Sequence, residues 1–210
     1  MRNNLLPVAK EGWSFVLSAV LVFFLFTILD LEFLAFMVFL ATLFFLFVYR
    51  NPERLVPIYQ EKSVVSPVDG VVLSIEELKE SEYAYKIEIN TTYTDVSVLR
   101  VPFTSKIKEF TLTHGTRISR FNKLSKKLNE NLEITFEDES KNSLKISHML
   151  QQSFDGIKID ILKQQKFQQG ARYGVMLHGI TTIYLPQNFR LNINVGNQIK
   201  ASESLLGYFS

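Results

Sequence analysis

The side chains that most often carry enzyme chemistry are scarce in this chain. Its 210 residues include no cysteine and three histidines, His114, His148 and His178. The lack of cysteine excludes disulfides, thiolate nucleophiles, iron–sulfur clusters and the usual zinc sites. With so few histidines we expect no metal site. The chemistry open to the chain therefore depends on carboxylates, hydroxyls and single histidines.

Two places combine polar groups that could act on a substrate. His178 stands beside Gly179 and near Thr181 in the sequence. It could act as a general base if its imidazole lay within about 3 Å of the proton to be removed. Adjacency does not ensure this contact, because neighbouring side chains of a strand point to opposite faces. Asp95 precedes Arg100, and it could serve a site, pair with the arginine or cap a turn. We keep Asp95 and His178 as candidate catalytic residues, with structural roles as the alternatives.

Two uninterrupted apolar runs lie near the start of the chain. Residues 13–29 and 33–49 carry no charge and are rich in phenylalanine and leucine. About 17 residues cover most of a hydrocarbon core about 30 Å thick, and Trp13 and Tyr49 sit where interfacial aromatics are expected. With Asp30, Leu31 and Glu32 as the turn, we predict two antiparallel transmembrane helices. A cleaved signal peptide and a buried helix pair of a soluble core are the alternatives.

Basic residues flank the outer ends of this helical hairpin, whereas its turn carries only acids. The flanking residues are Arg2, Lys10, Arg50 and Arg54. The positive-inside rule therefore places both termini in the cytoplasm. We expect residues 1–54 to form the transmembrane hairpin and its flanks in the inner (cytoplasmic) membrane, and residues 55–210 to form one soluble domain facing the cytoplasm. The 23 basic and 21 acidic residues nearly balance, which gives no support for a nucleic-acid partner.

The rest of the chain has short runs in which apolar and polar residues alternate. Valine, isoleucine, tyrosine and threonine are frequent in these runs, and proline, glycine or asparagine ends them, so we predict a mainly β domain. The predicted strands are 71–75, 85–89, 96–101, 107–112, 132–136, 157–162, 182–185 and 189–195. Residues 117–129 and, more weakly, 147–154 have helical spacing. Asp69-Gly70 is typical of a hairpin turn.

The predicted helix at 117–129 is strongly basic. Its apolar face holds Ile118, Phe121, Leu124 and Leu128, and around it stand Arg117, Arg120, Lys123, Lys126 and Lys127. Each basic side chain near anionic headgroups contributes ~1 kcal/mol of membrane attraction. We therefore take Arg117 and Lys123 as candidate lipid-binding residues, with a solvated helix face as the alternative.

Several motifs follow one another from about Tyr49 to the C-terminus. They are RNPER at 50–54, SPVDGVV at 66–72, DVSVLRVP at 95–102, NEN at 129–131, GARYG at 170–174, YLP at 184–186 and VGNQIKASE at 195–203. In this order, behind a membrane hairpin, they resemble the short class of phosphatidylserine decarboxylases.

This resemblance implies a phosphatidylserine decarboxylase-like β fold that ends in a lipoyl-type hairpin. It also implies a proenzyme that cuts its own backbone at a Gly-Ser pair and converts the serine into a pyruvoyl group. That ketone forms a Schiff base with the amine of phosphatidylserine and accepts electrons when carbon dioxide leaves. Within the family's Asp-x-His-x-Asn-Arg-x-Pro strand the chain keeps Asp95, Arg100 and Pro102. Arg100 is therefore a further candidate lipid-binding residue.

The chain departs from the family where the chemistry would occur. The family's Gly-Ser pair falls on Gly179-Ile180, in a segment one residue shorter than the short-class pattern. The isoleucine side chain has no nucleophilic oxygen and no leaving group on Cβ, so we expect no pyruvoyl cofactor. The family's histidine is Ser97, its asparagine is Leu99, and its arginine pair is missing from FDGI at 154–157. We list Gly179, Ile180 and Thr181 with the candidate catalytic residues because they occupy this segment.

Two functions follow from these observations. The first is a non-catalytic relative in phospholipid metabolism that keeps the fold and binds lipid or regulates a partner. The second is an active phosphatidylserine decarboxylase that makes phosphatidylethanolamine through an unorthodox nucleophile such as Thr181. A swinging-arm carrier would need a lysine at the tip of the closing hairpin, and Asn192, Ile193 and Asn194 include none. The expected partner is membrane phospholipid, with a homo-oligomer or a family-member partner left open and nucleic acid excluded.

Overall fold

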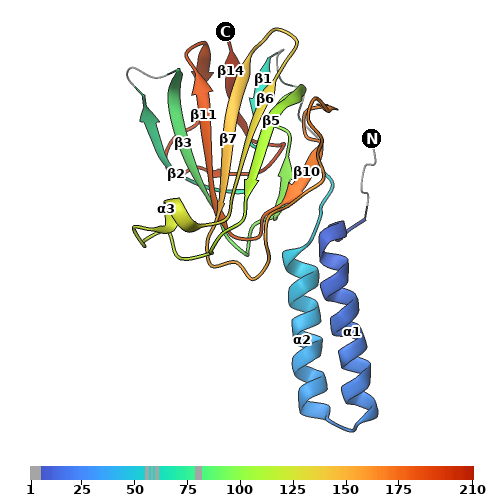
Figure 1. Ribbon diagram of the computed structural model, residues 1–210. Helices are drawn as coiled ribbons and strands as arrows, with labels where there is room; N and C mark the ends of the chain where they lie inside the picture. The colour runs from blue at the N-terminus through green and yellow to red at the C-terminus, as the bar shows by residue number, and fades with distance from the viewer. Residues whose placement is uncertain (1–5, 55–56, 58, 60–61, 79–81) are drawn as a thin grey trace. The chain divides into compact units, whose positions relative to one another are not determined.

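The computed structural model describes residues 6–54, 57, 59, 62–78 and 82–210. The chain divides into two compact units, residues 1–53 and 54–210. Arg2, one of the basic flanking residues, lies outside the described residues. Figure 1 shows the first unit as a pair of helices and the second as a set of twisted sheets.

The first unit is an antiparallel helical hairpin. After the short 3-10 turn η1 (Lys10–Gly12), α1 spans Trp13–Ile28 and α2 spans Glu32–Val48. Between them, Asp30 adopts a positive φ of 55°. At the open end the backbone N–H of Ala9 donates to the carbonyl of Tyr49 at 2.8 Å. A Cβ on Gly12 would lie 2.4 Å from the ring of Tyr49, so glycine permits this close approach.

The outward faces of both helices are apolar. Leu21 is 70% exposed and Phe33 is 73% exposed. The segment Lys10–Ile28, with 19 residues, is long and apolar enough to cross a membrane, whereas Glu32–Val48 has 17 residues and is shorter than the usual span. Two spanning helices were expected, and length and composition support the first of them.

The second unit contains three sheets. Their strands are β1 (Ser63–Val65), β2 (Gly70–Glu77), β3 (Tyr83–Thr91), β4 (Val98–Arg100), β5 (Ser105–Thr113), β6 (Asn131–Glu137), β7 (Ser143–Leu150), β8 (Lys158–Ile159), β9 (Lys166–Phe167), β10 (Arg172–Val175), β11 (Gly179–Pro186), β12 (Phe189–Leu191), β13 (Gln198–Ile199) and β14 (Leu205–Phe209). The largest sheet has eight strands in the order β13-β2-β3-β11-β7-β6-β5-β9. The two smaller sheets are β1-β14-β12 and β4-β10-β8.

One hydrophobic core joins the three sheets. Side chains of the large sheet, such as Ile87, Ile146 and Ile183, are fully buried in one cluster with Leu99 and Leu206 from the two smaller sheets. Successive residues of a strand face opposite sides, so the same strands present a second, outer face. The prediction of a mainly β domain is confirmed.

The structure corrects both helix predictions in this unit. Residues 147–154 are not helical, because 147–150 belong to β7, where alternate residues are buried and pair with β6 and β11 on either side. In 117–129, helix is confined to α3 (Ser125–Leu128). No sheet covers its expected apolar face, since Phe121 is 84% exposed, and the side-chain amide of Asn129 instead donates to the Ile118 carbonyl at 2.7 Å.

The strand predictions were most accurate within the large sheet. Residues 71–75, 85–89, 107–112, 132–136 and 182–185 lie within β2, β3, β5, β6 and β11. The segments 96–101, 157–162 and 189–195 contain only the shorter strands β4, β8 and β12. Asp69-Gly70 is not a hairpin turn, because β1 pairs with β14 and β2 pairs with β3. The expected closing hairpin is also not paired with itself: β12 pairs with β14, and β13 pairs with β2.

Candidate functional site

The pair Gly179-Ile180 opens a central strand of the large sheet. Gly179 lies opposite Thr91 on β3 and Leu150 on β7, and Ile180 lies opposite Asn90 and Met149. A Cβ on Gly179 would be 2.4 Å from the carbonyl oxygen of Met149, so no larger residue fits without backbone movement. The strand is paired on both sides from Gly179 onward.

The side chain of Ile180 faces a cavity of about 380 Å³ on the outer face of the sheet. The floor carries Lys86 and Glu88 from β3, Thr182 from β11 and Met149 from β7, and the segment that contains Arg120 and Phe121 forms a wall. The Nζ atom of Lys86 lies 2.8 Å from a carboxylate oxygen of Glu88. Ile180 itself is 6% exposed. The cavity therefore combines an apolar patch with charges of both signs.

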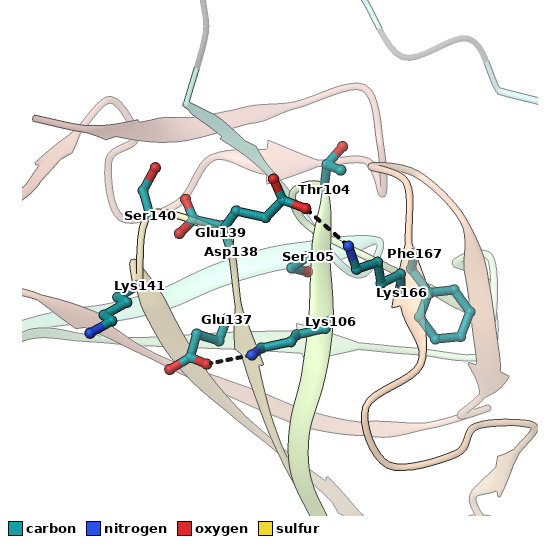
Figure 2. A pocket seen from close by; sticks show the side chains of 10 residues that line it. All are labelled: Thr104, Ser105, Lys106, Glu137, Asp138, Glu139, Ser140, Lys141, Lys166 and Phe167. Carbon is teal, nitrogen blue, oxygen red and sulfur yellow. Dashed lines mark hydrogen bonds and ion pairs between the residues drawn. The ribbon is translucent and has the colours of Figure 1, made fainter.

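A second cavity, of about 530 Å³, lies at the opposite end of β6 and β7 (Figure 2). Ion pairs cross it between Lys106 and Glu137 at 3.2 Å and between Lys166 and Glu139 at 3.0 Å. None of the predicted site residues lines this cavity. Because its charges are largely paired, it offers no clear recognition of a ligand.

Thr181 points into the core, on the face opposite Ile180. Its hydroxyl oxygen lies 2.8 Å from Nδ1 of His148, and Nε2 of His148 lies 2.6 Å from the hydroxyl of Tyr173. Burial lowers the pKa of His148 to about 3, and it raises the pKa of the Tyr173 hydroxyl. A neutral imidazole has one donor and one acceptor nitrogen, so it can serve both hydroxyls. The three side chains form a buried, uncharged hydrogen-bonded chain.

His148 was missed as a site residue by sequence reasoning. The apolar spacing of residues 147–154 also fits a helix, and the residue that His148 contacts lies 33 positions further along the chain. Alternation within β7 would have indicated that His148 faces the core. The cross-strand register that aligns it with Thr181 has no local signature in the sequence.

His178 does not contact Thr181 through a hydrogen bond in this arrangement. Its ring packs against Tyr93, with ring centroids 5.2 Å apart, and its Nε2 lies 3.5 Å from the side-chain nitrogen of Gln151. Burial lowers the pKa of His178. The same Gln151 nitrogen donates to the side-chain oxygen of Asn90 at 3.0 Å. His178 therefore belongs to a polar cluster at the end of the sheet where β11 begins.

Asp95 and the predicted lipid-binding residues Arg100, Arg117 and Lys123 differ in their surroundings. The carboxylate of Asp95 accepts hydrogen bonds from the backbone N–H and the hydroxyl of Thr92, at 2.9 and 2.8 Å, so it caps its own turn. Arg100 is buried, and this burial lowers its pKa to about 10. Arg117 lies 3.4 Å from the carboxylate of Glu130. Lys123 is exposed.

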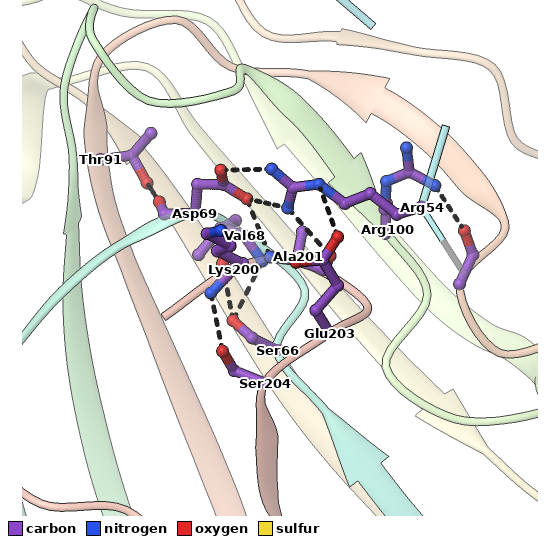
Figure 3. A network of polar contacts seen from close by, with 11 residues as sticks. Arg54, Ser66, Val68, Asp69, Thr91, Arg100, Lys200, Ala201, Glu203 and Ser204 are labelled. Carbon is purple, nitrogen blue, oxygen red and sulfur yellow. Dashed lines mark hydrogen bonds and ion pairs between the residues drawn. The ribbon is translucent and has the colours of Figure 1, made fainter. Parts of the chain in front are cut away.

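Asp69 is the centre of a buried polar network (Figure 3). Its carboxylate binds the guanidinium of Arg54 through both oxygens, one of them at 2.7 Å, and it accepts the backbone N–H of Ala201 at 2.8 Å. Its backbone carbonyl accepts the hydroxyl of Thr91 at 2.6 Å. Nε of Arg54 lies 3.7 Å from Glu203. Because Thr91 is the cross-strand neighbour of Gly179, the network borders the start of β11.

Ser97 also lies near this strand start. The residue is 2% exposed, and its carbonyl accepts the backbone N–H of Met176 at 2.8 Å. A Cβ on Gly179 would be 2.9 Å from the sulfur of Met176. The fold thus gathers Asp69, Ser97 and Gly179, which come from three motifs far apart in the sequence. Among the described residues, no group of three or more histidines or acids is arranged to hold a metal ion.

Comparison with known proteins identifies related chains over almost the full length. The sequence profile for phosphatidylserine decarboxylase matches residues 41–207. A phosphatidylserine decarboxylase proenzyme from Geotalea daltonii is 30% identical over 99% of both chains, and one from Geotalea uraniireducens matches equally well. A proenzyme of the same name from Desulfotalea psychrophila is 29% identical over 96% of both chains.

The buried Arg54–Asp69 ion pair should contribute to the stability of the β unit. In Asp69→Asn the buried guanidinium of Arg54 loses its counter-charge, and we expect the free energy of unfolding to fall by about 3 kcal/mol. Urea denaturation of the full chain in detergent, followed by circular dichroism, measures this change. The control is Glu76→Gln, whose exposed ion pair with Lys86 should contribute less than about 1 kcal/mol. Equal effects of the two substitutions would contradict the role assigned to Asp69.

The buried imidazole of His148 should make the stability of the fold depend on pH. Its pKa is about 3 in the folded chain, against 6.5 for an ordinary histidine. Between these values the unfolded chain binds a proton that the folded chain does not, so its stability falls as the pH falls below 6.5, by up to ~1.4 kcal/mol per pH unit. Denaturation midpoints measured between pH 7 and about 5 should show this slope. His148→Gln should reduce it, and parallel curves for the two proteins would rule the effect out.

Proposed function

The chain belongs to the phosphatidylserine decarboxylase family, and we propose that it is a membrane-bound member that binds phospholipid without decarboxylating it. The observation that carries this proposal is the side chain at position 180. In the family resemblance this position follows the glycine of the self-cleavage pair, and here it is an isoleucine that is paired on both sides within strand β11.

Self-cleavage needs atoms that Ile180 lacks. A side-chain oxygen must attack the carbonyl of Gly179 to form an ester, and that oxygen must later leave from Cβ. The sec-butyl group of Ile180 has neither function. It also fills its place in the structure, since it is 6% exposed against Met149 and the floor of the cavity. The residues at this position do not fit a pyruvoyl group.

A second difference supports the same proposal. The position that the resemblance assigns to the family's histidine is Ser97, which is buried and contributes no imidazole. The imidazole that hydrogen-bonds to a side chain of β11 is that of His148, and it lies on the core side, opposite Ile180. The self-cleavage serine and the histidine of the family are thus both replaced, by Ile180 and Ser97. These two replacements favour a binding or regulatory role over catalysis.

An active enzyme that uses Thr181 is the alternative, and one observation favours it. The Thr181 hydroxyl lies 2.8 Å from an imidazole nitrogen of His148, which is suitable geometry for a general base. Against it, Thr181 and His148 are both 0% exposed. A ketone forms from the eliminated residue only by hydrolysis, and these buried side chains offer water no access. We therefore rank this function second.

The location proposed for the protein follows from its first helix. Lys10–Ile28 is long and apolar enough to span a bilayer. The basic flanks of the hairpin favour an orientation with the β unit on the cytoplasmic side of the inner membrane. In that position membrane phospholipid would be the ligand, and a homo-oligomer or a second family member would be a further partner.

The intact mass of the purified protein tests the proposal directly. We expect one chain of 24.3 kDa by mass spectrometry. Two fragments that separate near Gly179, with a carbonyl-reactive N-terminus on the smaller one, would contradict it. The variant Thr181→Val serves as control, because it would abolish such cleavage only if Thr181 were the nucleophile.

Restoring a serine tests whether Ile180 is the single defect. We expect Ile180→Ser to remain uncleaved, because a serine at 180 faces the outer cavity while His148 lies on the core side, and Ser97 still replaces the family's histidine. Mass spectrometry after prolonged incubation measures cleavage. Thr182→Ser, which places a serine on the same face without the preceding glycine, is the matched control. Cleavage of Ile180→Ser alone would show that the remaining residues are sufficient.

A further inference from the structure

The segment 118–128 between β5 and β6 exposes large apolar side chains. Phe121, Leu124 and Leu128 are 84%, 54% and 47% exposed. Single exposed apolar residues are common, but a group of them within one short segment marks an interaction surface. We call this segment the apolar loop.

The apolar loop is also cationic. It carries Arg120, Lys123, Lys126 and Lys127 and no acidic residue. Among the residues that the structure describes, none of these four forms an ion pair. The guanidinium of Arg120 lies 4.9 Å from the ring centroid of Phe121, so a cation and an aromatic ring are presented together. The charge of this surface is thus open to an anionic partner.

The apolar loop is held in a defined conformation. Both polar atoms of the Asn129 side chain bond the backbone of Ile118, at 2.7 and 3.0 Å. The backbone N–H of Thr116 donates to the carbonyl of Leu128 at 2.7 Å, which closes the base of the loop. At the same base, Arg117 lies 3.4 Å from the buried carboxylate of Glu130. These contacts keep the loop ordered while its apolar residues stay in solvent.

The apolar loop borders the cavity over Ile180. Arg120, Phe121, Ser125 and Lys126 contribute to the lining of this cavity, which has a volume of about 380 Å³. A surface that binds the outside of the loop would therefore lie beside the cavity. Arg120 and Lys126 are shared by the two features and could contact phosphate groups from either side.

We propose that the apolar loop docks on the surface of an anionic phospholipid bilayer. Phe121 and Leu124 enter the interface, and the lysines and Arg120 bind lipid phosphates. Basic and aromatic side chains in one exposed segment are typical of interfacial binding. This inference rests on the proposal that the first helix holds the chain in a membrane. It assigns lipid contact to residues other than Arg117, whose charge is already paired with Glu130.

Because the chain has no cysteine, single cysteines can be labelled without background. We would attach an environment-sensitive dye to Phe121→Cys and, as control, to Ser140→Cys on the exposed turn between β6 and β7. The full chain is reconstituted into vesicles of phosphatidylcholine with or without phosphatidylglycerol. We expect a blue shift and quenching by bilayer-borne nitroxide lipids at position 121 only, and only with phosphatidylglycerol. The added substitutions Lys123→Gln, Lys126→Gln and Lys127→Gln should abolish both signals.

Other outcomes would overturn the inference in distinguishable ways. A dye at position 121 as water-exposed as the dye at 140 excludes docking. Equal quenching without phosphatidylglycerol excludes recognition of anionic lipid. A blue shift without quenching by lipid-borne nitroxide indicates a protein partner, such as a second copy of the chain. Co-flotation of the protein with the vesicles in a density gradient tests the helical anchor separately. A protein that does not float with the vesicles would contradict the proposed membrane location itself.

Discussion

The β unit depends on one physical constraint, which is that the buried carboxylate of Asp69 must be paired. A charge removed from water must be paired and hydrogen-bonded, and Asp69 meets this requirement with groups from distant parts of the chain. Arg54 supplies the counter-charge and Ala201 supplies a backbone N–H to the carboxylate, while the hydroxyl of Thr91 donates to the backbone carbonyl of Asp69. The first residue of the unit, the strand β3 and the C-terminal segment are thereby fixed together. Since β3 pairs with β11, the same network defines where Gly179 lies.

The sequence predicted features that have a local period and missed those that depend on distant pairing. Apolar and polar residues alternate clearly in strands β3 and β6, and the apolar runs of α1 and α2 have no interruption, so these strands and helices were predicted. Residues 147–150 of β7 fit a helical period as well as an alternating one, and their burial at alternate positions follows from the pairing of β7 with β6 and β11. Asp69-Gly70 has the composition of a hairpin turn, but the ion pair of Asp69 with Arg54 fixes its position in the fold. The contact of His148 with Thr181 depends on strand register.

The candidate site is divided between two faces of one strand. On the outer face, Ile180 closes the floor of a cavity that has apolar and charged walls. On the core face, Thr181 joins an uncharged chain with His148 and Tyr173 that is sealed from solvent. The face that a lipid could reach therefore lacks a nucleophile at position 180, and the hydroxyl that has a nearby base lacks access. This separation is the physical reason for proposing that the family scaffold is kept while its chemistry is lost.

That proposal is tested most directly by turnover of the lipid itself. The purified full chain would be incubated in vesicles that contain phosphatidylserine, and the lipids would be extracted and analysed by mass spectrometry. We expect no phosphatidylethanolamine beyond that in protein-free vesicles. Formation of phosphatidylethanolamine in molar excess over the protein, and its loss in the Thr181→Val variant, would contradict a non-catalytic role and establish the buried hydroxyl as a working nucleophile.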